Sequence, residues 1–369
     1  MKKILVLNYE FPPLGGGASP VSYEIAKGYA RLGHQVDVIT MGFKNIPRFE
    51  IKDNINIYRV RCWRSKKEMC YPHEQLTYLI PAYRLSSQLH KKRNYDICHT
   101  HFLIPTGVIA YWLFKRHKLP YIVTSHGSDV PGYNPDRFSF LHKFTGPILK
   151  SIAVNSKYVV APSQYLKRLI KKNISNNLTN LIYIPNGIDP DSFLPNTKNK
   201  SIFTSGRLLR RKGFQHLITA VADNDIGYQV NVCGDGPMMN KLNEIAAQSK
   251  TKIVFHGWLD NKSQKYINLL EQAAIYVLVS ERENASIALL EAMSAGCAMI
   301  TSDVYGCAET VNGAGTLLPP NNPEKIRQAI WQLINHPDEM KRSQNIARER
   351  VKKMYDWKII IEKYDNILK

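Results

Sequence analysis

Two glutamates eight residues apart, Glu283 and Glu291, offer the clearest chemistry in this sequence. An apolar, β-branched run over 273–280 precedes them and predicts a buried parallel strand. The run 287–295 predicts a helix that carries Glu291 and ends at Gly296. One carboxylate is therefore expected at the tip of a strand, and the other about 12 Å away if the segment is helical throughout. Two acceptor groups at that separation suit a ligand with hydroxyls at both ends.

The short segment between the two glutamates adds groups that bind anions. Asn284 or Ser286 is placed to cap the helix. Backbone N–H groups at a helix N-terminus form a ready anion site, so we expect a phosphate to face the cluster Asn284, Ala285, Ser286 and Ile287. Acceptors at both ends with phosphate donors between them match the layout of a sugar nucleotide.

A second loop, also placed after a predicted strand, carries cations of two kinds. In SIFTSGRLLRRKGF, Arg207 and Lys212 lie five residues apart across a tight loop ahead of a helix. Arginine presents a planar fork and lysine a point charge, and together they suit a diphosphate. Arg210 and Arg211 in the same loop are interpreted as a solvated face.

Two loops of the first half follow predicted strands as well. Three successive glycines in the loop 11–20 can bring backbone N–H groups close to an anion. This loop is not GxGxxG, because Pro20 occupies the last glycine slot, so no dinucleotide site is expected. The loop 124–129, TSHGSD, places His126 at a strand tip. His99 and His101 form an HxH, but no third ligand stands at a recognisable spacing, so we assign no metal.

These segments carry a family resemblance. The glutamate pair, followed by AMSAGCAMITSDVYGCAE, resembles the signature of retaining glycosyltransferases of the GT-B fold, family 4 type. PPLGGGAS, HGSD, PNGID, GRL…KG and CGDGP resemble further motifs of that family, in the expected order along nearly the whole chain. In one departure, Asn284-Ala285-Ser286 stands where the family often has Gly-Phe, which bears on the fit to the donor sugar.

The resemblance implies an enzyme that moves a sugar from a UDP- or GDP-sugar to a hydroxyl of a glycan or lipid-linked acceptor, with retention at the anomeric carbon. By this match Glu291 binds ribose hydroxyls, while Glu283 and His126 hold the sugar. The predicted catalytic residues are His126, Glu283, Arg207 and Lys212. The predicted donor-binding residues are Gly16, Gly17, Arg207, Lys212, Gly234, His256, Trp258, Glu283, Asn284, Ala285, Ser286, Ile287 and Glu291, and the acceptor-binding residues are His101 and Asp129.

The expected mechanism is electrostatic, because fixed positive groups face the phosphate charge as it develops. We expect no metal and no other cofactor. Asp189-x-Asp191 and Asp223-x-Asp225 are formally DxD metal motifs, but the first lies in a turn, where aspartate serves the backbone, and the second closes a helix. A donor phosphate oxygen acting as base, or a covalent intermediate on an enzyme carboxylate, both remain open.

The rest of the chain predicts the scaffold. A chain of 369 residues is too long for one ordinary core, so about two domains are expected. Strands and helices alternate, which predicts an α/β protein with doubly wound parallel sheets whose ligands bind at the carboxyl ends of the strands. The resemblance implies two Rossmann-like domains facing a central cleft: an acceptor domain over 1–183, a donor domain over 184–356, and a last helix, 357–369, that returns to the first domain.

The net charge of +20 is concentrated in the first half. Residues 1–180 hold 27 Lys and Arg against 10 Asp and Glu, whereas residues 181–369 hold 23 against 20. This distribution indicates an anionic partner for the first domain. The basic and aromatic segment 138–173 is typical of an interfacial contact with an anionic membrane. Nucleic acid is not expected, because no recognition-helix, RNP or zinc-finger pattern is present.

We find no targeting signal in the sequence and therefore expect a protein of the cytoplasm, peripheral at the cytoplasmic face of the membrane. No apolar run reaches the roughly 18–20 residues of a membrane span. The N-terminal run is too short for a signal peptide and lacks a small-residue cleavage site. The six cysteines form no CxxC, which suits a reducing compartment, and Cys98, Cys233 and Cys297 are expected in the core.

Two other functions fit parts of this pattern. A GT-B sugar-nucleotide epimerase or hydrolase would share the fold and donor site, but the glycine loop and the basic first domain favour an enzyme with an acceptor. A non-catalytic basic binding module would need none of the carboxylate arrangement.

Overall fold

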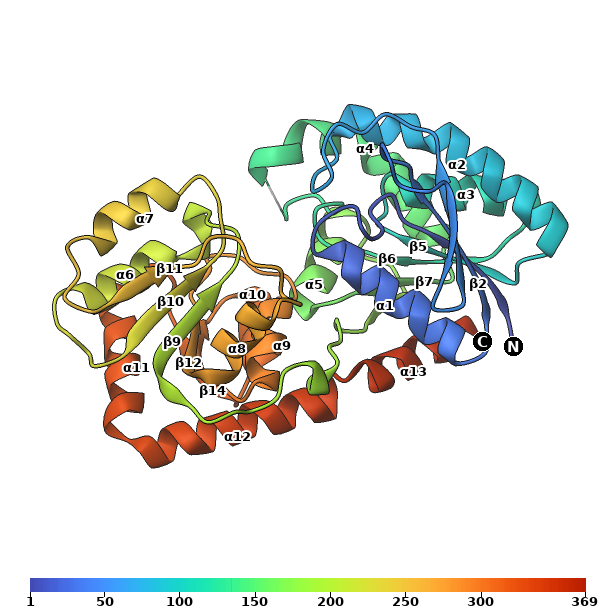
Figure 1. Cartoon of the computed structure of the whole chain (residues 1–369). Helices are drawn as coiled ribbons and strands as arrows, with labels where there is room; N and C mark the ends of the chain where they lie inside the picture. The colour runs from blue at the N-terminus through green and yellow to red at the C-terminus, as the bar shows by residue number, and fades with distance from the viewer. Residues whose placement is uncertain (134) are drawn as a thin grey trace. The chain divides into compact units, whose positions relative to one another are not determined.

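A computed structural model describes residues 1–133 and 135–369, with side chains described for all of these except 135–144. The chain divides into two compact units, Met1–Asn186 together with Trp357–Lys369, and Gly187–Asp356. Each unit is a largely or wholly parallel sheet with helices on both faces (Figure 1). The predicted α/β class with two Rossmann-like units is therefore confirmed.

The first unit is built on an eight-stranded sheet in the order β3-β4-β2-β1-β5-β6-β7-β8. Its strands are β1 (Lys3–Leu7), β2 (Gln35–Met41), β3 (Phe49–Lys52), β4 (Ile55–Val60), β5 (Ile97–His101), β6 (Tyr121–Thr124), β7 (Tyr158–Ala161) and β8 (Leu181–Tyr183). All neighbours pair in parallel except β3 and β4.

The edge strand β3 is an element that hydrophobic periodicity does not reveal. It is four residues long and mostly exposed, so it has no buried run. The turn that joins it to β4 consists of Asp53 and Asn54, whose φ angles are 48° and 59°. Two central residues with positive φ form the tight hairpin turn whose twist matches that of paired strands.

The helices of the first unit are α1 (Ala18–Arg31), α2 (Pro72–Arg93), α3 (Thr106–His117), α4 (Pro135–Asn155), α5 (Gln164–Asn173) and α13 (Trp357–Leu368). Figure 1 shows the red α13 beside the blue α1. The two helices meet where Gly28 faces Ile361, at a point where an added Cβ would lie 2.4 Å from the isoleucine side chain. His34 Nε2 and Asp365 Oδ1, 2.8 Å apart, tie the chain's last helix to the end of its first.

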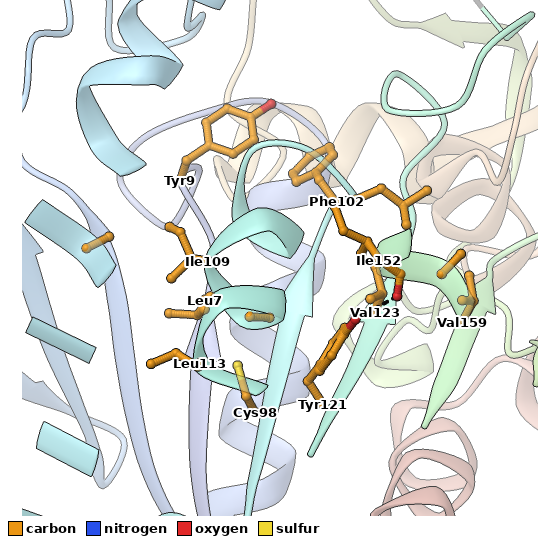
Figure 2. Close-up of a cluster of buried hydrophobic side chains, with 14 of the residues drawn as sticks. Leu7, Tyr9, Cys98, Phe102, Ile109, Leu113, Tyr121, Val123, Ile152 and Val159 are labelled. Atoms are coloured by element: carbon orange, nitrogen blue, oxygen red, sulfur yellow. Dashed lines mark hydrogen bonds between the residues drawn. The ribbon is translucent and has the colours of Figure 1, made fainter. Parts of the chain in front are cut away.

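The core of the first unit lies between the sheet and α2, α3 and α4. Leu7, Cys98, Tyr121 and Val123 from three strands meet helix residues such as Leu113 there (Figure 2). Because successive strand residues point to opposite faces, the alternate residues of the same strands pack under α1 and α13. The predicted burial of Cys98 is confirmed, as is that of Cys233 and Cys297 in the second unit.

The second unit has a six-stranded, wholly parallel sheet in the order β11-β10-β9-β12-β13-β14. Its strands are β9 (Asn199–Ser205), β10 (Gln229–Cys233), β11 (Ile253–Phe255), β12 (Ala273–Leu278), β13 (Ala298–Ser302) and β14 (Gly315–Leu318). Its helices are α6 (Phe214–Ala222), α7 (Met239–Ala246), α8 (Gln264–Gln272), α9 (Ile287–Ser294), α10 (Tyr305–Val311), α11 (Pro323–Asn335) and α12 (Pro337–Met354), with short 3-10 turns at Pro190–Ser192 and Arg210–Lys212.

Two apolar clusters cover the two faces of the second sheet. One joins α6, α7 and α11 to the sheet, and the other joins α8, α9 and α12. Neighbouring strand residues contribute to opposite clusters, as Ile202 and Phe203 do on β9. Within the described part of the chain, no helix is both long and apolar enough to cross a membrane.

Candidate active site

Loops at the carboxyl ends of β9, β10 and β12 interlock in the second unit. Gly206 N–H donates to the Cys233 carbonyl at 3.0 Å, and Leu208 N–H donates to that of Asp235 at 2.9 Å. Glu281 N–H donates to the Arg211 carbonyl at 2.8 Å. This bond brings the loop that carries Arg207 and Lys212 (the cationic loop) against the loop that carries Glu283 (the glutamate loop). The adjacency of β9 and β12 in the sheet makes this contact possible.

Gly234 lets two of these loops approach each other. A Cβ at this position would lie 1.9 Å from the Gly206 carbonyl oxygen, and its φ of 147° is one that other residues rarely adopt. A side chain there would separate the two loops. Its predicted contact with the donor nucleotide stays a prediction.

Lys212 and Glu283 form an ion pair between the two loops. Their side chains are 19% and 12% exposed, so the pair is largely shielded from water. Ser280 Oγ also donates to Glu283 Oε1, at 3.2 Å. Arg207 is exposed, and its guanidinium forms no ion pair with the described residues. One of the two predicted phosphate-binding cations is therefore held by the protein, and the other faces solvent.

Glu291 lies in α9 and is buried, with 4% of its surface exposed. Its carboxylate accepts hydrogen bonds from Asn261 Nδ2 at 2.9 Å and from Tyr266 Oη at 2.7 Å. Burial raises the pKa of Glu291 above its usual range, and these two hydrogen bonds partly oppose that rise. The two partners were not predicted, because Asn261 and Tyr266 precede Glu291 by 30 and 25 residues and belong to no motif.

The segment between the glutamates is a loop and not a continuous helix. Ser286 occupies the N-cap position of α9, as predicted for this residue or Asn284, but its side chain forms no capping hydrogen bond. The loop is held from outside, since Gly306 N–H donates to the Glu283 carbonyl at 3.1 Å. A Cβ on Gly306 would lie 1.4 Å from the Asn284 carbonyl oxygen.

Gly306→Ala is therefore expected to push the 283–286 loop out of place. Overpacking of this kind costs about 1–3 kcal/mol of folding free energy. The affinity for a nucleotide sugar should fall by more than the loss of stability explains, because the displaced loop carries Glu283. Gly146→Ala is the control, because an added Cβ there meets nothing within 4 Å. Calorimetric titration at a temperature where both variants are folded would check this, and equal affinities would contradict it.

His256 and Trp258, two of the predicted donor-binding residues, follow β11. His256 Nε2 lies 2.9 Å from Asn231 Oδ1, so its ring is held by the neighbouring strand. Trp258 is 72% exposed, and its predicted contact with the donor stays a prediction. Between them, the Gly257 carbonyl accepts from Gly234 N–H at 2.8 Å.

In the first unit, Gly16 and Gly17 are exposed at the start of α1. Neither would meet another atom within 4 Å if it carried a Cβ, so the surface above them is open. Arg64 supports this loop from behind: it donates to the carbonyls of Tyr9 at 3.2 Å and Lys67 at 3.1 Å. The Lys67 carbonyl in turn accepts from Gly15 N–H at 2.9 Å.

His126 follows β6, and its backbone is fixed by Asp129. One Asp129 oxygen accepts from Ser125 Oγ at 3.0 Å and from the N–H groups of His126 at 3.1 Å and Gly127 at 3.0 Å. The other accepts from Leu103 N–H at 2.8 Å. Burial raises the pKa of Asp129, and these bonds oppose the rise.

Asp129 and His101, the two predicted acceptor-binding residues, are both buried in the first unit. Asp129 is 5% exposed and its carboxylate is engaged by two loops of its own unit, so it holds the His126 loop in place. His101 has no exposed surface. Its Nδ1 lies 3.1 Å from His126 Nε2, and its predicted contact with the acceptor stays a prediction.

Asp129→Ala should therefore act first on folding. It leaves several buried donors without an acceptor, which costs roughly 3 kcal/mol. Urea denaturation would measure this loss against Glu68→Ala, an exposed site where a change within about 0.5 kcal/mol is expected. Equal stability of the two variants would show that the four hydrogen bonds contribute little.

The two DxD segments serve the fold. Asp189 caps a 3-10 turn by accepting from Asp191 N–H at 3.1 Å. Asp223 pairs with Arg327 at 2.6 Å, and Asp225 accepts from Gly227 N–H at 2.9 Å. Among the residues that the structure describes, no group of three or more His, Cys, Asp or Glu side chains could hold a metal ion.

Comparisons with known proteins agree with these two units. The model of the family "Glycosyltransferase Family 4" matches residues 15–192, and that of "Glycosyl transferases group 1" matches residues 187–350. An uncharacterized glycosyltransferase of Methanocaldococcus jannaschii is 26% identical over 100% of this chain and 98% of its own.

Solved structures match the fold over the full length. Sucrose-phosphate synthase from Thermosynechococcus elongatus superposes with a TM-score of 0.84 at 20% identity, covering 100% of this chain and 98% of that one. Anabaena HepE in complex with UDP gives a TM-score of 0.79 at 18% identity, with 99% of each chain covered. The chain therefore belongs to the family 4, group 1 glycosyltransferases of the GT-B fold.

Proposed function

We propose that this glycosyltransferase transfers a hexose from a nucleotide diphosphate sugar to a hydroxyl group, with retention at the anomeric carbon. The observation that carries the proposal is the contact between the cationic loop and the glutamate loop in the second unit, where Lys212 pairs with Glu283. A cation and a carboxylate at one sheet edge provide for a diphosphate and for sugar hydroxyls. Parallel sheets bind ligands at this edge.

In this proposal each group of the second unit has one task. Arg207 and Lys212 bind the diphosphate and stabilise its charge as the sugar leaves. Glu283 binds sugar hydroxyls, and Glu291 accepts from ribose hydroxyls. His126 of the first unit contacts the donor sugar. The donor is a UDP-sugar or a GDP-sugar, and the solved neighbour that holds UDP favours UDP.

We further propose that transfer needs no metal ion, because fixed cations meet the developing phosphate charge. Thermal shift against UDP-, GDP-, ADP- and CMP-sugars, each with and without EDTA, tests the donor and the metal together. A ligand at 100 times its dissociation constant adds roughly 2.7 kcal/mol of stability. A shift with one nucleotide class that EDTA leaves unchanged would support the proposal. A shift that EDTA abolishes would overturn the metal-free part, and no shift with any donor would count against the donor site.

The proposed acceptor is a glycan or a lipid-linked glycan of cell-surface polysaccharide, lipopolysaccharide or glycolipid synthesis. We propose that the protein works at the cytoplasmic face of an anionic membrane, held there by its basic first unit. Arg168, Lys171 and Lys172 of α5 are exposed. The apolar side of α5, Leu166 and Ile170, is buried in the core, so this helix offers charge and not apolar insertion.

Exposed apolar side chains lie elsewhere in the same unit. Trp63, Leu76 and Ile80 are 62%, 65% and 48% exposed. In the segment 138–173, side chains 138–144 lie outside the described residues. Sedimentation with anionic liposomes at low salt is expected to carry the protein down, and neutral liposomes should not. Lys171→Glu combined with Lys172→Glu should weaken the effect, and failure of anionic liposomes to bind would sink the proposal.

A further inference from the structure

Three histidines stand in a row inside the first unit, and the proposed function uses only the last of them. His99 and His101 lie on β5 and His126 follows β6. The ring centroids of His99 and His101 are 4.5 Å apart, and those of His101 and His126 are 5.3 Å apart. His99 and His101 have no exposed surface. The row therefore runs from the core to the loop that carries His126.

The hydrogen bonds of this row separate His99 from the other two. His99 Nδ1 lies 3.0 Å from Tyr29 Oη, and its Nε2 lies 2.8 Å from Thr124 Oγ1, so both of its ring nitrogens have partners. His101 Nδ1 lies 3.1 Å from His126 Nε2. His101 Nε2 is buried and has no hydrogen-bond partner among the described residues. Within that part of the chain, the polar contact of the His101 ring is with His126.

All three rings are neutral near pH 7. Burial lowers the pKa of His99 to about 3 and that of His126 to about 3. Burial, with His99 and His126 nearby, also lowers the pKa of His101 well below its usual range. A neutral imidazole carries one proton, on one of its two nitrogens. Between His101 Nδ1 and His126 Nε2, one nitrogen must therefore donate and the other accept.

The unpartnered nitrogen of His101 decides which one donates. If the proton of His101 were on Nε2, an N–H group would be buried without an acceptor. Orphaned N–H groups are rarer in proteins than under-used acceptors. With the proton on Nδ1, His101 donates to His126 and leaves only a lone pair unused. His126 Nε2 is then an acceptor, and the proton of His126 is on Nδ1.

We propose that His101 is a positioning residue that holds His126 as the Nδ1–H tautomer, so that His126 offers its ligand a hydrogen-bond donor and not a base. The usefulness of this donor rests on the proposed function, in which His126 contacts the oxygen-rich donor sugar. Asp129 fixes the backbone of His126, and His101 fixes its ring. In a histidine, the hydrogen bond made by one ring nitrogen decides whether the other nitrogen carries the proton that a ligand meets.

The test reads the tautomer directly and needs no substrate. Long-range ¹H–¹⁵N NMR of the full chain labelled with ¹⁵N-histidine distinguishes a protonated Nδ1 from a protonated Nε2, and His126→Asn assigns the signals. The expected result is a protonated Nδ1 and a bare Nε2 on His126. A protonated Nε2 on His126 would overturn the proposal, whatever the donor assays show.

Two nearly isosteric variants separate the hydrogen bond from packing. His101→Asn can place an amide N–H where Nδ1–H stands, whereas His101→Leu has the same branching and no donor. His101→Asn should keep the tautomer of His126 and keep kcat within about threefold, and His101→Leu should lose the tautomer and lower kcat by about 10- to 100-fold, with a smaller change in KM. His99→Asn disturbs the same row without touching the His101–His126 bond, so it should leave the tautomer unchanged.

The outcomes distinguish this proposal from the proposed function. If Leu and Asn at position 101 give the same tautomer and the same kcat, or if His99→Asn shifts the tautomer as much as His101→Leu does, the positioning role of His101 is wrong. A wild-type Nδ1–H signal together with the Asn-to-Leu difference in tautomer supports it. Activity that survives His126→Asn would remove the donor contact from the proposed function while the tautomer measurement stands.

Discussion

Lys212→Met is expected to lower kcat/KM by about 100- to 1,000-fold, the loss seen when a preorganised group that meets developing charge is removed. An ammonium group has three donors, so Lys212 can hold Glu283 and still contact a diphosphate. Because the pair is largely shielded from water, its field acts in a medium of low dielectric constant, where it is stronger than at a solvated surface. Steady-state kinetics with the donor identified by thermal shift would measure the loss.

The structure allows a rival explanation, which a double variant tests. Lys212 could serve only to neutralise Glu283, whose carboxylate is 12% exposed and would otherwise repel the donor phosphates. In that case Lys212→Met combined with Glu283→Gln would recover much of the activity lost in the single variant. We expect no recovery, because a diphosphate contact is lost in both. Arg210→Met is the matched control: it changes an exposed cation of the same turn and should leave kcat/KM nearly unchanged.

The contact between Lys212 and Glu283 could be predicted only in part from the local sequence. Each residue follows an apolar run that predicts a strand, and carboxyl ends of parallel strands share one edge of a sheet. The motif resemblance then placed both side chains at a donor. The direct neighbourhood of β9 and β12 was not predictable from periodicity, because strand order in a sheet depends on which helices pack where.

Contacts between residues far apart in the sequence were not predicted. Glu291 was identified, but Tyr266 and Asn261 were not. Tyr266 lies on α8 and Asn261 in the turn before it, and no local pattern reports how these segments pack against α9. His99 and His101 lie on one face of β5, as the period of two requires. Which face is buried depends on α13: Tyr364 Oη, 3.2 Å from Thr124 Oγ1, covers this row from the far end of the chain. The burial of His101 therefore has a tertiary cause that its local sequence does not report, and its predicted acceptor contact stays a prediction.

Glu291→Gln is expected to lower kcat/KM by about 100- to 1,000-fold while leaving the fold as stable as before, or more stable, at neutral pH. The loss of activity follows from the proposed contact with ribose hydroxyls, because a neutral amide replaces a carboxylate whose charge-assisted hydrogen bonds are worth about 1.5–3 kcal/mol each. The stability follows from what the amide can still do. Its oxygen can accept from Asn261, and its NH₂ can donate to Tyr266 Oη, which then donates to Ser205 Oγ, 3.1 Å away.

The pH dependence of folding stability distinguishes the loss of a buried charge from a local structural defect, because only the loss of the charge changes the stability difference in a fixed direction with pH. Because burial raises the pKa of Glu291 in the folded state, the folded chain binds this proton more tightly than the unfolded chain. The wild type therefore loses stability as pH rises through that window, and Gln does not titrate. The melting temperature of Glu291→Gln, relative to wild type, should rise between acidic and neutral pH.

Glu291→Ala completes the comparison, because it removes the hydrogen-bonding groups as well as the charge. Tyr266 Oη keeps Ser205 Oγ as a partner, but the amide of Asn261 and the space left by the carboxylate are not filled. We expect the alanine variant to be less stable than wild type by about 1–3 kcal/mol. If Gln and Ala were equally destabilising and Gln kept full activity, Glu291 would be a structural residue. If Gln is stable and inactive, the buried charge lowers folding stability and is retained because the donor needs a carboxylate there.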